Sequence, residues 1–201
     1  MSIERVGVVG CGLMGSGIAE VAARAGKDVI VCEATDELVA AGRQRIEASL
    51  SRAVANEKLS ASDRDHALSR LTFTTRLTDL AECDLIVEAI VEDLEAKRST
   101  FHELDALCRP STIFASNTSS LAISDIATAT ARADRFVGLH FFNPVPVMAL
   151  VEVVRTLLTS GEAFAEAVAF VKEIVADHGG TIRVESEVGR GTTFTIELTE
   201  A

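Results

Sequence analysis

Aromatic side chains that carry a polar group are absent from this sequence. Its 201 residues include no Trp and no Tyr. Proteins that bind single-stranded nucleic acid stack bases on aromatic rings and line the groove with cations. Cations are also scarce, because 19 Lys and Arg stand against 30 Asp and Glu and leave a formal net charge of −11. An acidic chain is repelled by phosphate backbones, so we expect no nucleic-acid partner.

Long apolar runs and paired cysteines are missing as well. No run reaches the roughly 18 residues that a membrane helix needs. The start, MSIERVGVVG, has no charged segment followed by an apolar segment, so we expect no signal peptide. The four cysteines (Cys11, Cys32, Cys83 and Cys108) have no CxxC spacing, which is typical of reduced, mostly buried thiols. These absences predict a cytoplasmic protein with no membrane partner.

Metal-ligand spacing is lacking too. His66, His102 and His178 lie in segments of helical pattern, and none of them has a ligand-spaced partner. His178 precedes Gly179 and fits the end of a helix. We therefore expect no metal site.

Short apolar runs alternate with amphipathic segments along most of the chain. Hydrophobic residues make up 48% of the sequence, enough for one full core but not for two large domains. Apolar runs predict buried strands at 5–10, 28–32, 72–75, 84–88, 112–115, 136–140 and 150–154. Apolar spacing and capping residues predict helices at 13–25, 35–56, 62–71, 94–107 and 161–178, with Ser62 capping the third. This alternation predicts an α/β domain whose mostly parallel sheet carries helices on both faces.

The last stretch follows a different pattern. Gly179 and Gly180 end the preceding helix, and two alternating segments, 181–187 and 192–198, flank a Gly-containing turn. We therefore expect an α/β domain over 1–178 and a β-hairpin extension over 179–201. The first hairpin strand is expected to join the edge of the sheet.

A glycine-rich turn follows the first predicted strand and opens the first predicted helix. Gly10, Gly12 and Gly15 match GxGxxG, with Cys11 at the second position and Leu13 and Met14 at the fourth and fifth. The first glycine permits the tight turn, the second lets the backbone approach a diphosphate, and the third lets helix and strand pack closely. The helix N-terminus offers free N–H groups and partial positive charge to that diphosphate.

An acidic residue ends the second predicted strand. Glu33 lies eighteen residues after Gly15, close to the roughly 20 expected for a carboxylate that binds the ribose hydroxyls of a dinucleotide. The same carboxylate repels a 2′-phosphate, and its neighbours Cys32 and Ala34 supply no cation. The pattern favours NAD over NADP, with a Gly-rich turn that binds no ligand as the alternative.

A histidine and a carboxylate are positioned for acid–base chemistry. His140 ends a predicted strand, the Pro-bearing run FFNPVP follows it, and Glu152 lies in the next predicted strand. Because that connection turns the chain back, both side chains can reach one site. A carboxylate on one imidazole nitrogen holds the tautomer in which the other nitrogen takes a proton from a substrate hydroxyl. The residues alone leave open a purely structural role for His140.

A run of small polar residues, SNTSS at 116–120, follows another predicted strand. Open α/β sheets bind ligands at the carboxyl ends of their strands. Hydroxyls there can hold a substrate oxygen or a nicotinamide. An ordinary cap of the helix that begins near Ile123 explains the run equally well.

Four segments in order resemble one family. The chain contains VGVVGCGLMGSGIAEVAARAG, DLIVEAIVEDLEAK, FASNTSSLAI and GLHFFNPVPVMALVEVV. Together they resemble the N-terminal domain of 3-hydroxyacyl-CoA dehydrogenases, especially bacterial 3-hydroxybutyryl-CoA dehydrogenases, over residues 3 to 174. The resemblance implies a Rossmann fold, a doubly wound sheet that binds NAD. It also implies oxidation of (S)-3-hydroxyacyl-CoA to 3-oxoacyl-CoA, or the reverse.

The resemblance assigns roles to matching residues. His140 resembles the catalytic base and Glu152 the carboxylate that orients it. Ser119 and Asn143 resemble residues that contact the substrate oxygen and the nicotinamide.

Four further residues resemble ligand contacts of the family. Glu92 and Lys97 resemble contacts on the cofactor side, near the nicotinamide ribose. Ser49 and Lys58 resemble contacts to coenzyme A.

The dehydrogenase resemblance stops where the family continues into a helical domain. From Val171 onward the chain resembles the end of sensor histidine kinase ATP-binding domains, most clearly in the GxGTTF pattern at 189–194, which suggests a chimera. No ATP site is carried over. A module that binds NAD without turnover is therefore the alternative function, and an exposed apolar face is expected to favour a homo-oligomer.

Overall fold

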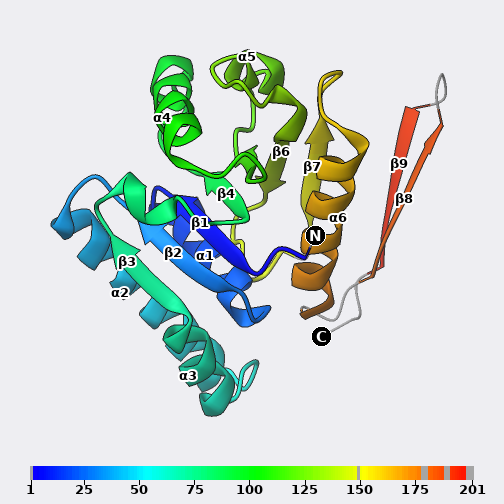
Figure 1. Cartoon of the computed structure of the whole chain (residues 1–201). Helices are drawn as coiled ribbons and strands as arrows, with labels where there is room; N and C mark the ends of the chain where they lie inside the picture. The colour runs from blue at the N-terminus through cyan, green and yellow to red at the C-terminus, as the bar shows by residue number, and fades with distance from the viewer. Residues whose placement is uncertain (1, 149, 178–180, 188–190, 198–201) are drawn as a thin grey trace.

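The structure is a computed structural model that describes residues 2–148, 150–177, 181–187 and 191–197. Its main sheet has seven strands in the order β3-β2-β1-β4-β5-β6-β7 (Figure 1). The strands are β1 Arg5–Val9, β2 Asp28–Cys32, β3 Leu71–Thr74, β4 Leu85–Glu88, β5 Ile113–Ser116, β6 Phe136–Phe141 and β7 Val151–Arg155. Neighbouring strands are parallel from β3 to β6, and β7 runs antiparallel to β6.

Helices cover both faces of this sheet, as the alternating pattern predicted. They are α1 Leu13–Arg24, α2 Asp36–Ala55, α3 Ala61–Ser69, α4 Leu94–Leu107, α5 Ile123–Ala127 and α6 Gly161–Asp177. Short 3₁₀ segments lie at Leu77–Leu80 and Ala133–Arg135. Helices α1, α2 and α6 share one apolar core with the sheet, and α4 and α5 share the other.

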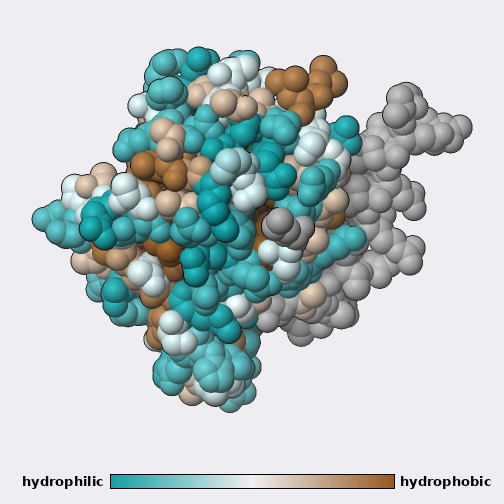
Figure 2. All heavy atoms as spheres, in the orientation of Figure 1, coloured by the Kyte–Doolittle hydropathy of each residue, from teal (hydrophilic) through white to brown (hydrophobic). Residues whose placement is uncertain are grey.

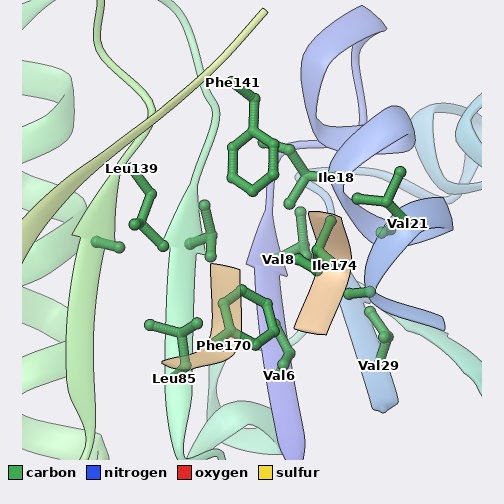
Figure 3. Close-up of a cluster of buried hydrophobic side chains, with 14 of the residues drawn as sticks. Val6, Val8, Ile18, Val21, Val29, Leu85, Leu139, Phe141, Phe170 and Ile174 are labelled. Carbon is green, nitrogen blue, oxygen red and sulfur yellow. The ribbon is translucent and has the colours of Figure 1, made fainter. Parts of the chain in front are cut away.

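The two cores explain why the strands are continuous apolar runs. Val6 and Val8 of β1 point toward α1 and α6, where they meet Ile18, Phe170 and Ile174 (Figure 3). On the opposite face, Phe101 of α4 packs on Phe114 and Phe136 with ring centroids 5.4 and 4.6 Å apart. Strands buried on both sides need apolar residues on both faces, which produces the continuous apolar runs.

The strand order reverses between β1 and β4, and this reversal positions the site. From β1 the chain proceeds outward to β2 and β3, then returns to β4 on the other side of β1. The loops after β1 and β4 consequently diverge and leave a crevice at the carboxyl ends of the strands, where such sheets bind ligands.

Two sequence predictions need correction. Helix α3 begins at Ala61, and the hydroxyl that accepts the Asp63 N–H at 3.0 Å belongs to Ser60, not to Ser62. Both serines precede the same apolar residues, and only the backbone conformation decides which one caps.

The hairpin exists but does not extend the main sheet. Strands β8 Thr181–Glu187 and β9 Gly191–Glu197 pair with each other in a separate two-stranded sheet (Figure 1). Helix α6 packs against both β7 and β8, and so separates the hairpin from the sheet edge it was expected to join.

The surface in Figure 2 is mostly hydrophilic, with a few hydrophobic side chains exposed. Leu157, just after β7, and Val147, in the loop before β7, are the most exposed of these, and Leu158 is more than half exposed. All four cysteines are buried and free. No helix among the described residues is long and apolar enough to cross a membrane.

Candidate active site

The glycine turn links β1 to α1 as predicted. Gly10 has φ +90°, a conformation that only glycine adopts without strain. A Cβ on Gly15 would lie 1.8 Å from the Gly10 carbonyl oxygen, so α1 packs on the turn through this position. A Cβ on Gly12 would meet nothing within 4 Å, and this open space in front of the N-terminus of α1 is where a diphosphate fits.

Glu33 lies beside this turn, at the end of β2. Its carboxylate accepts the Cys11 N–H at 2.5 Å and the Ala34 N–H at 3.1 Å. Gly10 and Glu33 line one cavity of about 650 Å³, which we call the Glu33 cavity. The open turn and the acid at one cavity fit the adenosine half of NAD.

Helix α2 holds the turn from the other side, through residues that the sequence analysis did not single out. The Arg45 guanidinium donates to the Cys11 carbonyl at 2.7 Å. Gly42 faces the Cys11 side chain so closely that a Cβ would lie 2.4 Å from its Sγ. Burial raises the pKa of the Cys11 thiol to about 11, and the nearby Glu33 carboxylate adds to that rise. Cys11 is thus a packing residue of the turn and stays protonated.

His140 and Glu152 form the predicted pair. They are direct cross-strand partners on β6 and β7, and His140 Nδ1 lies 2.8 Å from Glu152 Oε2. The imidazole is also in contact with the Phe142 ring, with centroids 4.5 Å apart. When Nδ1 donates its proton to Glu152, Nε2 keeps a free lone pair and is able to act as a base.

Two cavities meet at the histidine. The central cavity, of about 370 Å³, is lined by Met14 at the start of α1 and by residues at or just after the ends of β4, β5 and β6. They include Glu92, Asn117, Ser119, His140 and Asn143. The outer cavity, of about 870 Å³, includes Ser119, His140, Glu152 and Leu157. Ser119 and His140 line both cavities, so a ligand that passes from one into the other meets the base and a hydroxyl together.

Glu92 organises the polar segment that carries Ser119. One of its carboxylate oxygens accepts the Thr118 hydroxyl, the Ser119 N–H at 3.1 Å, and the N–H and hydroxyl of Ser120 at 3.3 and 3.1 Å. Partial burial opposes its ionisation, but hydrogen bonds from Thr118, Lys97 and Ser120 and the Lys97 charge outweigh this and lower the pKa of Glu92 to about 2. The carboxylate is therefore charged at neutral pH.

Lys97 lies deeper than a direct ligand contact would. Its side chain is 1% exposed, and Nζ lies 2.6 Å from Glu88 and 3.3 Å from Glu92. Glu88, at the end of β4, is fully buried. The sequence analysis missed Glu88, although a charged residue that closes the apolar run DLIVE was a signal.

Ser49 and Lys58 are not brought together with the other predicted residues. Ser49 faces α1, where it lies near the buried Glu20. Lys58 lines a cavity of about 1160 Å³ with Asp28, which begins β2. That cavity is at the amino ends of the strands, opposite to His140. Among the residues that the structure describes, no group of three or more His, Cys, Asp or Glu is placed to hold a metal ion.

Comparison with known families agrees with this geometry. Residues 5–184 match the model of the family described as 3-hydroxyacyl-CoA dehydrogenase, NAD binding domain. The chain belongs to this family. The match indicates NAD as the cofactor, in agreement with the glycine turn and Glu33, and extends beyond residue 174, where the sequence resemblance was expected to end.

The alignments with named relatives span most of this chain but only part of each relative. The 3-hydroxybutyryl-CoA dehydrogenase of Mycobacterium tuberculosis is 52% identical over 175 residues, 87% of this chain and 61% of that protein. The crystal structure of M. tuberculosis FadB2 superimposes with a TM-score of 0.86 at 51% identity, over 88% of this chain and 62% of that chain. The crystal structure of the (S)-3-hydroxybutyryl-CoA dehydrogenase PaaH1 of Ralstonia eutropha superimposes with a TM-score of 0.84 at 42% identity. The superposition covers 86% of this chain and 61% of that chain. The chain thus spans about three fifths of these relatives.

Proposed function

We propose that this chain is the NAD-binding and catalytic part of a dehydrogenase that interconverts (S)-3-hydroxyacyl-CoA and 3-oxoacyl-CoA. The name of the M. tuberculosis relative suggests 3-hydroxybutyryl-CoA as the substrate. The observation that carries the proposal is the His140–Glu152 pair, 2.8 Å apart, whose histidine lines the same cavity as Met14 of the glycine turn. A proton acceptor beside a dinucleotide site is what oxidation of an alcohol requires.

NAD supplies the hydride acceptor at the nicotinamide ring when it is bound. In the oxidation, His140 Nε2 removes the proton of the substrate's 3-hydroxyl group. Glu152 keeps Nδ1 protonated and stabilises the imidazolium that forms, and in the reverse reaction His140 returns the proton to the 3-oxo oxygen. A base placed in this way contributes roughly 10²–10⁴-fold to the rate.

Ser119 and Asn143 are proposed to bind the substrate oxygen and the nicotinamide amide. Both line the central cavity with His140. We propose that Glu92 accepts a hydrogen bond from the nicotinamide ribose. Among the described residues, its Oε2 has Lys97 at 3.3 Å as its one partner, while Oε1 takes the donors of the polar segment. Ser49 and Lys58 remain proposed coenzyme A contacts on the family resemblance alone, since neither is among the described residues that line a cavity with His140.

The test is reduction of acetoacetyl-CoA by NADH, followed by absorbance at the NADH band. We expect turnover by the unchanged chain and a loss of at least about 10²-fold in His140→Ala. His102→Ala serves as the matched control, because His102 is an exposed histidine on α4 away from both cavities.

The alternative is a module that binds NAD without turnover. It is favoured if NADH binds in a fluorescence titration but neither the unchanged chain nor His102→Ala oxidises it. Turnover that survives in His140→Ala contradicts the assignment of the base.

Three further expectations belong with this proposal. We infer a cytoplasmic location, because four free cysteines suit a reducing compartment. A homo-oligomer is supported by the exposed Leu157 and Leu158, and light scattering tests it.

The division into 1–178 and 179–201 is supported by the separate sheet of the hairpin. The likeness of the hairpin to sensor histidine kinases stays a prediction and implies no ATP site.

A further inference from the structure

Glu88 is a buried carboxylate that the proposed reaction does not use. It is fully buried at the end of β4, on the face of the sheet that α4 covers. It accepts the Lys97 ammonium at 2.6 Å, the Ser116 hydroxyl at 2.7 Å and the Ile90 N–H at 2.8 Å. Because burying two charges is costly, such a pair adds little net stability, and its geometry is the more informative property.

The geometry connects Glu88 to the central cavity in two steps. Lys97 Nζ lies between Glu88 and Glu92, at 2.6 and 3.3 Å. Glu92 in turn accepts the donors of residues 118–120, including the N–H groups of Ser119 and Ser120. Glu88 also binds Ser116, the last residue of β5, so it holds the polar segment from its start as well.

We propose that Glu88 is a positioning residue of the dehydrogenase site. By holding the Lys97 ammonium, it keeps Glu92 extended toward residues 118–120, and the segment then presents Ser119 to the cavity that His140 shares. Without the carboxylate at position 88, Lys97 has Glu92 as its one charged partner among the described residues. It then draws Glu92 inward and away from the Ser119 and Ser120 amides. This inference rests on the function proposed above.

The test variant is Glu88→Gln, which keeps the size of the side chain and removes its charge. We expect faster hydrogen exchange at the Ser119 and Ser120 amides, measured by NMR. We also expect kcat to fall by about 10²-fold, as for a displacement of about 1 Å near a reacting centre. Because kcat is counted per NADH-binding site, misfolded protein does not contribute to the loss, and KM for acetoacetyl-CoA is expected to change by less than threefold.

Phe101→Leu is the matched control for a general loss of packing. Phe101 lies on α4 like Lys97 and is fully buried, but it packs on Phe114 and Phe136 and not on the polar network. It is expected to lower stability without changing exchange at Ser119 and Ser120 or kcat per site.

A second variant decides the matter if Glu88→Gln does not fold. Glu88→Gln combined with Lys97→Met removes both buried charges, a replacement that proteins often tolerate. Because no ammonium is then left to draw Glu92 inward, exchange at the two amides is expected to stay within about threefold of the unchanged chain. Wild-type exchange at both amides in folded Glu88→Gln, or accelerated exchange in the folded double variant, overturns the proposal. An unchanged chain that binds no NADH overturns the proposed function instead, and the exchange measurement still reports on Glu88.

Discussion

At the scale of single residues, two glycines of the first turn suit their positions for different reasons. Gly15 faces the backbone, since a Cβ would lie 1.8 Å from the Gly10 carbonyl oxygen. Gly12 faces open space within 4 Å. The protein itself therefore requires glycine at position 15, whereas at position 12 the bound diphosphate is the reason that glycine suits the site.

This difference predicts that two alanine substitutions affect the free energy of unfolding differently. Gly12→Ala is expected to leave the free energy of unfolding within about 0.5 kcal/mol of the unchanged chain and to weaken NADH binding. Gly15→Ala is expected to lower that free energy by about 1–3 kcal/mol as well, because the turn must open. Urea unfolding and NADH fluorescence titration measure both quantities. Wild-type NADH affinity in Gly12→Ala contradicts the placement of the diphosphate.

At the scale of elements, α2 supports the nucleotide site although it contributes none of its predicted cofactor ligands. Its Arg45 donates to the Cys11 carbonyl, and its Gly42 allows it to approach the Cys11 side chain. Glu33 binds the N–H of the same residue. Cys11 is thus held by its N–H, its carbonyl and its side chain, and the turn it belongs to is prepared before a ligand arrives.

Gly42→Ala tests this support. A Cβ there would lie 2.4 Å from Cys11 Sγ, so either α2 or the turn has to move. We expect a loss of about 1–3 kcal/mol in the free energy of unfolding together with weaker NADH binding. Gly161→Ala, at the first residue of α6, is the control, because its Cβ meets nothing within 4 Å. Equal effects of the two substitutions in urea unfolding count against the role of α2.

At the scale of the whole molecule, the main sheet and the hairpin differ in how they are supported. Strands β1 and β4 are paired on both sides and buried under helices on both faces. Strands β8 and β9 pair only with each other. A two-stranded sheet on its own is marginally stable in water.

Hydrogen exchange is therefore expected to be much slower in β1 and β4 than in β8 and β9, because the central strands open only with the whole fold. We also expect a chain that ends at Asp177 to bind NADH like the unchanged chain, since every described residue that lines the Glu33 cavity or the central cavity lies before the hairpin. Lost NADH binding in the shortened chain would show that the hairpin supports the site.

The sequence alone determined the elements and the parts of the site whose signals are local. Buried parallel strands need continuous apolar runs, so the seven strands of the main sheet were predicted within one or two residues of their bounds. The glycine turn and Glu33 follow a fixed spacing imposed by one strand–turn–helix–strand unit. The sequence also predicted that His140 and Glu152 reach one site, because the Pro-bearing connection turns the chain back, whereas their direct cross-strand register came from the structure.

Only the tertiary structure decided the contacts between distant segments. Glu88 meets Ser116, Glu92 meets Ser119 and Arg45 meets Cys11, in each case across more than 20 residues of chain. No local period or spacing specifies such pairs, because they depend on which strands become neighbours and how close the helices pack. The place of the hairpin was decided in the same way, by α6 lying against both β7 and β8. Local sequence sets backbone conformation, whereas the site depends on side chains that only the packed core brings together.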